Sequence, residues 1–590
     1  MEITRIFDIL QYNKDEYDST NEVFANKING EWRKYNILEY IDLAEDISFG
    51  LLSLKVKKGD KIAIISSNCP EWNFIDMGIM QIGAIPIPIF PGISESDYTY
   101  IFNHSKVSIV FCEGEELIQK IEHILPEIAS IKQIFTFEKT NNYKNLKQLI
   151  QVGKENAQPL LLEEIKASIQ AEDLATIVYT SGTTGKQKGV MLTHANIISN
   201  LFEVSFISPA KFGDKALSFL PLCHAYERIL NYMYQYLGIS VYYAENISSI
   251  AENILEIQPG IFSTVPRLME KIYDKIIDKG RNLKWFQRQI FFWAVNLGHN
   301  YELDIKPRFF YNFQLMIANH LIFNKWRDAL GGKLKVIVSG GATLQPRLAR
   351  IYTAAGIPIL EGYGLTETSP VICVNTFFKN GRKFGTVGPP LPSIKLRIND
   401  DGEVLCKGPN VMKGYYNEPE LTKEAIDENG WFHTGDTGII EETGQLRLIG
   451  RKKTMFKTSN GKYVNPELIE EKLKESPFID NIIVMGENQK FAAALIVPDF
   501  IHFKSWCVIK AYKFPEANEM INSSIIRDRI QREVDKYNKY FGDAEQIKKF
   551  EIIDFEWTAK TGELTPTLKL KRNFINEKYK NNIEKVFNSL

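Results

Sequence analysis

Short apolar runs rich in β-branched residues alternate along most of the chain with amphipathic stretches of helical period. Four of these runs have the continuous apolar character of buried strands, at residues 61–66, 107–112, 175–180 and 335–339. Helical patterns precede or follow each run. This alternation predicts α/β layers rather than an all-β fold or a helical bundle.

Two amphipathic stretches carry helix start and stop signals. Residues 37–54 follow Asn36, whose side chain is a favoured N-cap. Residues 345–355 are followed by Gly356, which suits the end of a helix. The most apolar run, residues 74–90, is interrupted by polar residues and prolines, so it predicts a buried helix leading into a strand rather than a membrane span.

The pattern changes after about residue 390, where short strands such as residues 402–407 lie between turns and predict a small β subdomain. A compact α+β unit follows. It contains a helix capped by Asn465 and Pro466 and two strands, at residues 479–485 and 491–497. We therefore predict two domains, residues 1–450 and residues 451–590.

Size and composition fit a multidomain soluble enzyme. The chain has 590 residues, of which 44% are hydrophobic and 24% charged. Its formal net charge of −1 gives no electrostatic reason to expect a nucleic acid partner. The six cysteines are scattered without metal-ligand spacing, which favours reduced, packed thiols in a cytosolic protein.

We expect the protein to be cytoplasmic, because residues 1–15 carry charges throughout and lack the apolar core of a signal peptide. The aromatic-rich stretch at residues 285–323 predicts long helices. These could line a lipid entrance, contact the inner face of a membrane as a peripheral site, or form ordinary helical core. The sequence leaves the oligomeric state open.

The segment YTSGTTGKQKGV, residues 179–190, is the most informative in the chain. A predicted strand ends at Thr180 and is followed by glycines, hydroxyl side chains and two lysines. Glycine lets the backbone approach a ligand, and successive N–H groups with hydroxyls bind phosphates. The spacing is not that of a Walker A loop. Taken alone, the segment could also be a glycine-rich surface turn.

Four further segments change that balance. Ser339-Gly340-Gly341-Ala342 follows a predicted strand, and EGYGLTETSP at residues 361–370 places an aromatic beside glycines, hydroxyls and a carboxylate. WFHTGD at residues 431–436 ends in a carboxylate suited to a ribose diol. GRKKTMFK at residues 450–457 supplies cations at the predicted domain junction.

Together these segments resemble the adenylate-forming superfamily of AMP-binding enzymes, in order and with ordinary spacing from about residue 20 to 575. The resemblance implies a large N-terminal domain of two α/β sheet subdomains plus a small β barrel, and a small mobile α+β C-terminal domain. It also implies ATP and Mg²⁺, with coenzyme A as a second substrate.

The resemblance assigns roles residue by residue. The phosphate loop would hold the β- and γ-phosphates, Tyr363 would stack on adenine, and Asp436 and Arg451 would hold the ribose. The residues assigned to binding ATP or coenzyme A are Thr180, Ser181, Gly182, Thr183, Thr184, Gly185, Lys188, Gly340, Gly341, Ala342, Gly362, Tyr363, Gly364, Asp436, Arg451 and Lys457. Gln187 departs from the proline that is usual between the loop lysines, which leaves the stiffness of the loop in doubt.

Four residues are assigned to the chemistry. Thr366 would contact the α-phosphate and Glu367 would bind Mg²⁺. Lys569, in LTPTLKLKR at residues 564–572, resembles the adenylation lysine, although Lys571 is close enough to be confused with it. His224 would lie at the carboxylate end of an acyl tunnel. Without the other motifs, Lys569 would belong to a solvated basic tail and His224 would be a packed core histidine.

Details of the sequence resemble the long-chain acyl-CoA synthetase branch, among them LPLCHAYER at residues 220–228 and VPR at residues 265–267. The resemblance implies that a fatty acid forms an acyl-adenylate, and that the small domain rotates about Lys453 before coenzyme A attacks. An acyl carrier protein as acceptor, a stand-alone acyl-AMP ligase and an inactive acyl-adenylate-binding scaffold remain alternatives. A P-loop nucleotidase is excluded because the glycine-rich segment does not have the spacing of a Walker A loop.

Overall fold

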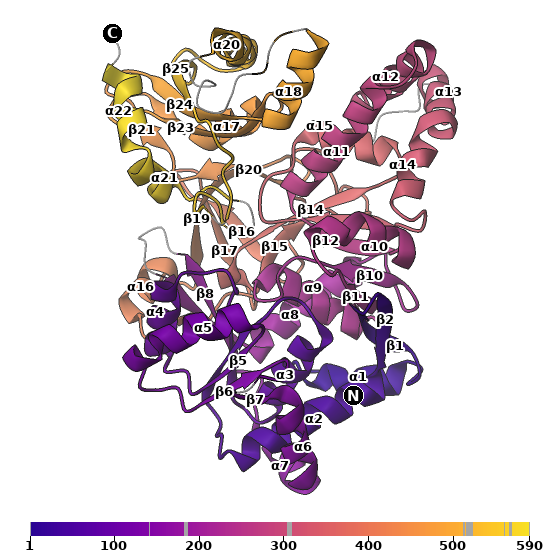
Figure 1. Cartoon of the computed structure of the whole chain (residues 1–590), viewed down its shortest axis with the longest axis vertical. Coiled ribbons are helices and arrows are strands. Elements are labelled where there is room, and N and C mark those ends of the chain that lie inside the picture. Colours follow the sequence, from indigo (N-terminus) through magenta and orange to yellow (C-terminus); the bar gives the residue numbers. More distant parts are fainter. Residues whose placement is uncertain are drawn as a thin grey trace.

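The computed structural model of the chain describes residues 2–140, 142–181, 187–303, 309–510, 512, 514, 523–559, 561–565 and 569–588. Figure 1 shows the elements within residues 8–168 in the lower part of the molecule and those of the C-terminal segment at the top.

The first sheet is parallel throughout and lies near the N-terminus. Its strand order is β4-β3-β5-β6-β7. The strands are β3 (Lys61–Ile65), β4 (Ile85–Pro88), β5 (Ile109–Cys112), β6 (Gln133–Thr136) and β7 (Lys144–Asn145). The helices of this region are α1 (Asp8–Glu16), α2 (Ile37–Ser53), α3 (Pro70–Gln81), α4 (Glu95–Ser105), α5 (Glu115–Ile124), α6 (Leu146–Glu155) and α7 (Pro159–Ser168).

The second sheet has eight strands in the order β15-β14-β13-β12-β10-β11-β1-β2, and only its two outer pairs are antiparallel. Its strands are β1 (Glu22–Ile28), β2 (Glu31–Asn36), β10 (Lys215–Ser218), β11 (Ser240–Tyr243), β12 (Ile261–Thr264), β13 (Val336–Ser339), β14 (Ile359–Gly364) and β15 (Val371–Val374). The helices of this region are α8 (His194–Ile207), α9 (Ala225–Tyr236), α10 (Ile250–Ile257), α11 (Pro266–Arg281), α12 (Trp285–His299), α13 (Phe309–Ala318), α14 (Asn324–Ala329) and α15 (Pro346–Ala354).

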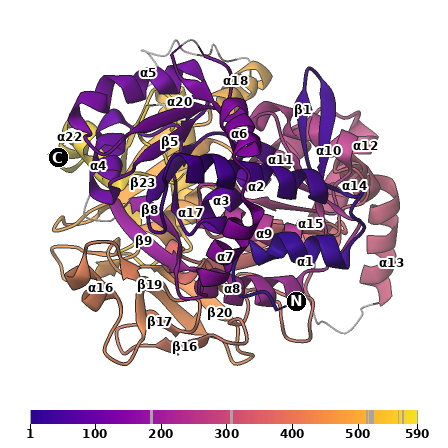
Figure 2. The same ribbon diagram turned by 90° about the horizontal axis from the view of Figure 1, so that it is seen from below.

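Two smaller antiparallel sheets complete the large part of the chain. One pairs β8 (Leu174–Ser181), β9 (Gln187–Thr193) and β18 (Gly414–Tyr415). The other contains β16 (Lys395–Ile398), β17 (Glu403–Lys407), β19 (Phe432–Ile440) and β20 (Leu446–Arg451), with α16 (Pro419–Ala425) beside it. In Figure 2 this second sheet lies to one side of the helices of the N-terminal region. It is the small β subdomain that the sequence predicts.

The C-terminal segment forms its own α+β unit. A two-stranded hairpin is followed by a three-stranded sheet of order β23-β24-β25. The strands are β21 (Phe456–Lys457), β22 (Tyr463–Val464), β23 (Ile479–Met485), β24 (Ala492–Pro498) and β25 (Ile547–Ile552); the described helices are α17 (Pro466–Leu473), α18 (Phe500–Ile509), α20 (Ser524–Asn538), α21 (Arg572–Lys578) and α22 (Lys580–Asn588). The domain boundary itself stays a prediction.

The local signals in the sequence are confirmed. Asn36 accepts a hydrogen bond from the Glu39 backbone N–H in a full capping box at the start of α2. Gly356 follows α15 with φ +75°, a conformation that glycine adopts without strain. Asn465 caps α17 by accepting a hydrogen bond from the Glu467 N–H. All six cysteines are free and five are buried.

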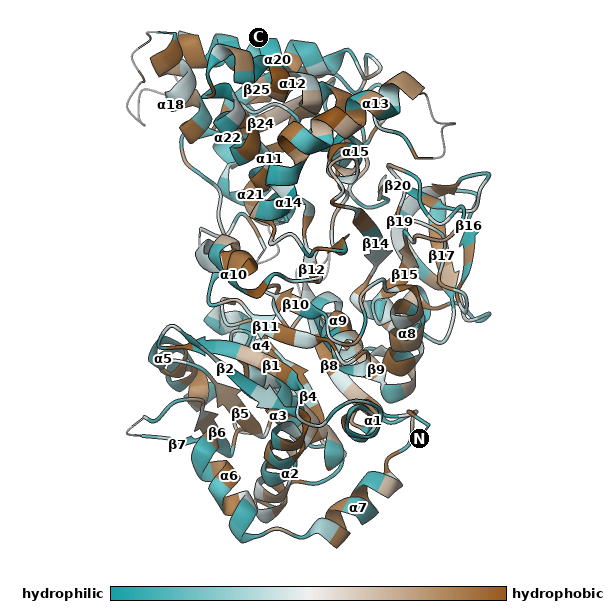
Figure 3. Cartoon of the chain, turned by 90° about the vertical axis from the view of Figure 1, so that its right-hand side faces the viewer, coloured by the Kyte–Doolittle hydropathy of each residue, from teal (hydrophilic) through white to brown (hydrophobic). Residues whose placement is uncertain are grey.

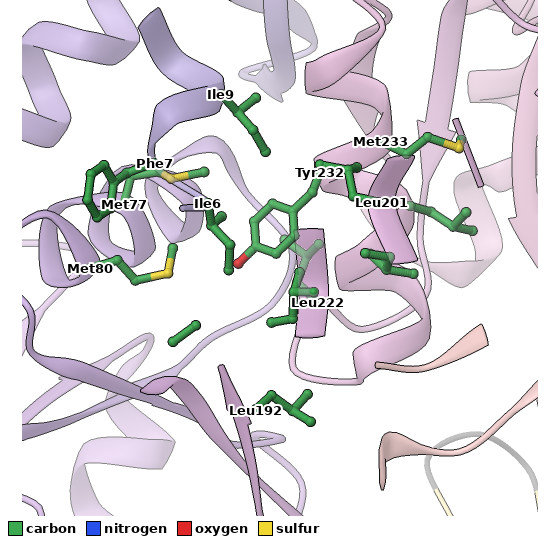
Figure 4. Packing of buried hydrophobic residues seen from close by; sticks show 14 of the residues in the cluster. Ile6, Phe7, Ile9, Met77, Met80, Leu192, Leu201, Leu222, Tyr232 and Met233 are labelled. Atoms are coloured by element: carbon green, nitrogen blue, oxygen red, sulfur yellow. The ribbon is translucent and has the colours of Figure 1, made fainter. Parts of the chain in front are cut away.

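Apolar side chains from distant segments form the main core (Figure 4). Ile6 and Phe7 precede α1, Met77 lies on α3, Leu192 on β9 and Tyr232 on α9, and all five belong to one buried cluster. Burial of this surface is the main driving force that holds the N-terminal segment against the hairpin β8–β9 and against α9. The hairpin carries predicted site residues and His224 directly precedes α9, so the core fixes the relative positions of these residues.

The aromatic insert divides between core and surface. On α12, Phe291, Val295 and Leu297 are buried in a second cluster. On α13, Phe309 and Phe310 are 78% and 79% exposed, and Phe313 and Met316 are also exposed. The α12–α13 region therefore has both the buried core and an exposed apolar helix face, which is visible as hydrophobic colouring in Figure 3. Within the described ranges, no helix combines the length and the apolar character needed to cross a bilayer.

Candidate active site

The predicted phosphate loop connects the paired strands β8 and β9. Thr180 lies opposite Lys188 in this hairpin, and Ser181 lies opposite Gln187. The pairing fixes the two ends of the loop next to each other. The predicted phosphate-binding residues Gly182, Thr183, Thr184 and Gly185 lie outside the described residues.

Lys188 and Glu367 both contact the side chain of Tyr415. The short strand β18 pairs with β9 and places Tyr415 opposite Val190. The Lys188 ammonium lies 4.8 Å from the centre of the Tyr415 ring, a cation–π contact. The Tyr415 hydroxyl donates a hydrogen bond of 2.9 Å to a carboxylate oxygen of Glu367. A cation and a carboxylate are thus held together beside the loop.

Backbone contacts fix Glu367. It lies with Thr366 in the short 3₁₀ helix η4 (Thr366–Thr368), directly after β14. Its carbonyl accepts a hydrogen bond of 2.8 Å from the Met412 N–H. A Cβ atom at Gly364 would lie 1.7 Å from the Pro370 carbonyl oxygen, so the turn that leads into η4 requires glycine. Gly362, two positions earlier, pairs with Val374 of β15.

The second glycine segment lies at the end of β13. The Gly340 N–H donates a hydrogen bond of 3.2 Å to the Thr264 carbonyl at the end of β12. A Cβ atom at Gly340 would approach the Tyr226 ring to 2.9 Å, so the ring packs directly on this backbone. Gly341 has φ +82°, and it and Ala342 are exposed. The exposed backbone at Gly341 and Ala342 could lie against a planar ligand.

Tyr363, Asp436 and Arg451 form a row across three strands. The Tyr363 hydroxyl donates a hydrogen bond of 2.8 Å to Asp436, whose other oxygen lies 3.1 Å from Nε of Arg451. Asp436 and Arg451 are also cross-strand partners in β19 and β20. Burial raises the pKa of Asp436 and Arg451 opposes that rise. The row presents a carboxylate and a guanidinium on the adjacent strands β19 and β20.

His224 precedes α9 and stacks on Phe90, with 6.2 Å between the ring centres. Its Nε2 atom is buried and has no hydrogen-bond partner among the described residues. Burial, and after it the charge of Lys569, lowers the pKa of His224 to about 4. The ring is therefore neutral at pH 7, with a polar atom available to a ligand.

Lys569 reaches the same region from the small domain. Its ammonium interacts electrostatically with His224, Asp436 and Arg451. The side chain is exposed to solvent, yet protein surrounds it on several sides; this partial desolvation, with repulsion from Arg451, lowers its pKa. Lys571 instead precedes α21, and its backbone N–H donates a hydrogen bond to the Glu563 carbonyl.

Lys457 is the predicted site residue that the structure leaves apart. It lies in the hairpin β21–β22, and its ammonium is 5.4 Å from the centre of the Tyr463 ring. Its carbonyl accepts a hydrogen bond from the Asn488 N–H, also in the small domain.

Sequence reasoning missed three aromatic residues that contact the predicted site residues: Tyr415, Tyr226 and Phe90. Nothing in the sequence links these aromatic residues to Lys188, Gly340 or His224, since only the fold brings them together.

Comparison with known proteins agrees with this geometry. A family model described as "AMP-binding enzyme" matches residues 14–416, and one described as "AMP-binding enzyme C-terminal domain" matches residues 454–590. The long-chain-fatty-acid–CoA ligase FadD15 of Mycobacterium bovis is 31% identical over 98% of this chain and 96% of its own length. Human long-chain-fatty-acid–CoA ligase 1 is 29% identical over 95% of this chain and 83% of its own.

Solved structures show the same fold. The Mycobacterium tuberculosis fatty acyl CoA synthetase matches with a TM-score of 0.61 and 20% identity, over 98% of this chain and 99% of that one. The adenylation domain of a carboxylic acid reductase from Segniliparus rugosus, in complex with AMP and a carboxylic acid, matches with a TM-score of 0.73 and 19% identity, over 99% and 94%. The chain belongs to the AMP-binding, adenylate-forming enzymes.

Proposed function

We propose that this enzyme activates a long-chain fatty acid with ATP and then transfers the acyl group to coenzyme A. The observation that supports this best is that Lys569, from the small domain, lies close enough to interact electrostatically with His224, Asp436 and Arg451 of the large part of the chain. It brings a mobile cation to residues that suit a carboxylate and a nucleotide. The printed names of relatives about 30% identical over nearly the whole chain give the substrate class.

In the first step a carboxylate oxygen of the acid attacks the α-phosphorus of ATP. The bond between the α- and β-phosphates breaks, and pyrophosphate leaves with the electron pair. The Lys569 ammonium would neutralise charge on the carboxylate and α-phosphate oxygens, and Thr366 would hydrogen-bond the same phosphate. The neutral His224 ring would hydrogen-bond the acid through Nε2. Asp436 and Arg451 would hold the ribose.

Glu367 is a suitable ligand for Mg²⁺. This ion commonly takes one or two protein carboxylates together with substrate phosphates and water, and Glu367 lies beside the phosphate loop. When bound, the ion would supply charge neutralisation at the phosphates. Tyr415 would keep the carboxylate oriented, and Lys188 would contact the β- and γ-phosphates.

In the second step the sulfur of coenzyme A attacks the acyl carbon of the mixed anhydride. The bond between that carbon and the phosphate oxygen breaks, AMP leaves, and the thiol proton passes to solvent. We propose that the small domain turns before this step, because Lys457 and its hairpin lie apart from the site in the present arrangement.

The test measures AMP and pyrophosphate release with ATP, Mg²⁺ and fatty acids of graded length, with and without coenzyme A. The proposal expects multiple turnover to AMP only when both coenzyme A and a long acid are present. Acyl-adenylate that accumulates although coenzyme A is present would favour an acyl carrier protein as acceptor. No turnover with any acid would overturn the proposal and favour a scaffold.

We also propose contact with a membrane surface through α13. Its exposed face consists of Phe309, Phe310, Phe313 and Met316, and no acidic residue occurs from Phe309 to Arg327. Exposed apolar helix faces without acidic residues suit the boundary of an anionic bilayer, where long-chain acids also dissolve. The triple change Phe309→Asn, Phe310→Asn and Phe313→Asn should reduce co-sedimentation with anionic vesicles, whereas Leu160→Asn, at another exposed apolar position, should not. Equal binding of both variants would contradict it.

A further inference from the structure

Arg267 and Asp480 join the large part of the chain to the small domain. Arg267 lies in the first turn of α11 and Asp480 in β23, and their side chains form an ion pair. Both are largely buried, with 19% and 12% of the side chain exposed. We propose that Arg267 and Asp480 are positioning residues for adenylation: their ion pair holds the small domain where Lys569 faces the site. This inference rests on the proposed function.

Arg267 is fixed relative to the glycine segment that begins at Gly340. Helix α11 begins two residues after Thr264, whose carbonyl accepts the hydrogen bond from the Gly340 N–H. Arg267 also lies 3.2 Å from Glu270, which accepts a hydrogen bond of 3.0 Å from Gln345 at the start of α15. The Arg267 guanidinium is therefore held by the same part of the second sheet that carries the predicted nucleotide-binding residues Gly340 and Gly341.

Asp480 is fixed relative to Lys569 through the small domain. Glu470 of α17 accepts a hydrogen bond of 2.6 Å from the Val484 N–H of β23, the strand that contains Asp480. The other oxygen of Glu470 pairs with Arg572, three residues beyond Lys569. Two hydrogen bonds, of 2.7 and 3.0 Å, join Lys569 to Thr565.

These contacts form a continuous path from Gly340, through Arg267 and Asp480, to Lys569. The link between Arg267 and Asp480 is the step in that path that crosses between the domains. A rotation of the small domain must break it, whereas the pair between Glu470 and Arg572 would move as a unit. The ion pair therefore favours the arrangement for the first step and opposes the arrangement for the second.

The test compares Asp480→Asn with Asp480→Glu, and with Glu302→Gln as a control. Glu302 pairs with Arg350 at 2.8 Å, within the large part of the chain. Acyl-adenylate formation is measured from ATP and acid, and thioester formation from supplied acyl-adenylate. Asp480→Asn should slow the first reaction roughly tenfold, as expected for loss of a charged hydrogen bond, and should preserve or speed the second. Asp480→Glu should restore most of the first rate.

A second readout does not depend on activity. Arg451, Lys452 and Lys453 form a tryptic site at the junction, and Arg451 is held in β20 opposite Asp436. Loss of the ion pair should loosen the small domain and speed cutting at this site several-fold in Asp480→Asn but not in Glu302→Gln.

Unchanged adenylation, an equal fall in both reactions, or unchanged cutting would overturn the inference. A wild-type enzyme without either reaction would instead overturn the proposed function. In that case the rates of tryptic cutting would be the test of this inference.

Discussion

Lys569 and Lys571 are two positions apart, but their surroundings differ. The Lys569 side chain interacts with His224, Asp436 and Arg451, whereas Lys571 lies at the N-cap position of α21 and is tied by its backbone to Glu563. The sequence leaves the choice between the two lysines open, because both belong to the same basic run. The surroundings favour Lys569 as the adenylation lysine.

Replacement of Lys569 by alanine should slow acyl-adenylate formation by roughly 10²–10³, the usual effect of losing one preorganised charged contact. Thioester formation from supplied acyl-adenylate should continue. Lys571→Ala is the matched control and should retain adenylation. Rapid-quench measurement of acyl-adenylate checks both variants; near wild-type adenylation in Lys569→Ala would show that this lysine has another role.

The lowered pKa of Lys569 gives a pH dependence. The ammonium form is the one that neutralises phosphate charge, so adenylation should fall as pH rises through the pKa of Lys569. Because desolvation and Arg451 lower that pKa, the fall should begin below the range of a free lysine. Measurement of the adenylation rate over a range of pH gives the pH at which this fall occurs. Relief of the repulsion in Arg451→Gln should move the fall to higher pH, and a fall that moves the other way would contradict the account.

Tyr415→Phe tests the contact between the hairpin and Glu367. Loss of the hydrogen bond to the carboxylate should weaken use of Mg²⁺ and ATP by roughly 10- to 100-fold, the range for a hydrogen bond to a charged group. Tyr416→Phe, at the adjacent position, is the control. Kinetics at varied Mg²⁺ distinguish the two variants, and identical Mg²⁺ dependence in both would show that Tyr415 does not orient Glu367.

At the scale of elements, the sequence predicted those helices and strands that local signals specify. The strands β3 and β23 and the helices α2 and α17 appear within a few residues of their predicted bounds, because apolar periodicity and caps determine them locally. The strand β18 has two residues and no periodicity to detect. It nevertheless carries Tyr415, so the contact between Lys188 and Glu367 could not be predicted.

Glu361, on β14, makes stability depend on pH. Burial raises its pKa to about 8, and the nearby Glu471 acts in the same direction. The folded state therefore binds a proton more tightly than the unfolded chain, and this contribution to stability is lost as pH rises from the unfolded pKa of about 4.5 through about 8. The fall amounts to a few kcal/mol at most.

Glu361→Gln removes that titration while it keeps an acceptor for the Leu344 N–H. Thermal unfolding should show little difference from wild type at acidic pH and a higher midpoint for the variant at alkaline pH. Parallel pH curves for the two proteins would contradict the raised pKa.

At the scale of the whole molecule, the site depends on contacts between residues far apart in the sequence. Tyr363 and Asp436 are 73 positions apart, and Arg267 and Asp480 are 213 apart. Local patterns cannot predict such pairs, because strand order and domain contact decide them. The motifs did predict the family, since each motif is local; the roles assigned to their residues stay predictions. Lys457 and Lys569 both belong to the small domain, and the orientation of that domain, which the sequence does not specify, decides which of the two lysines faces the site.

The central claim is that the acid is activated as an acyl-adenylate. The most direct measurement uses a long-chain acid labelled with ¹⁸O in its carboxyl group, with ATP, Mg²⁺ and coenzyme A, followed by mass analysis of the products. Attack on the α-phosphorus leaves one carboxyl oxygen on the phosphate, so the account predicts AMP that carries one ¹⁸O. Unlabelled AMP, or ADP with labelled phosphate, would contradict it.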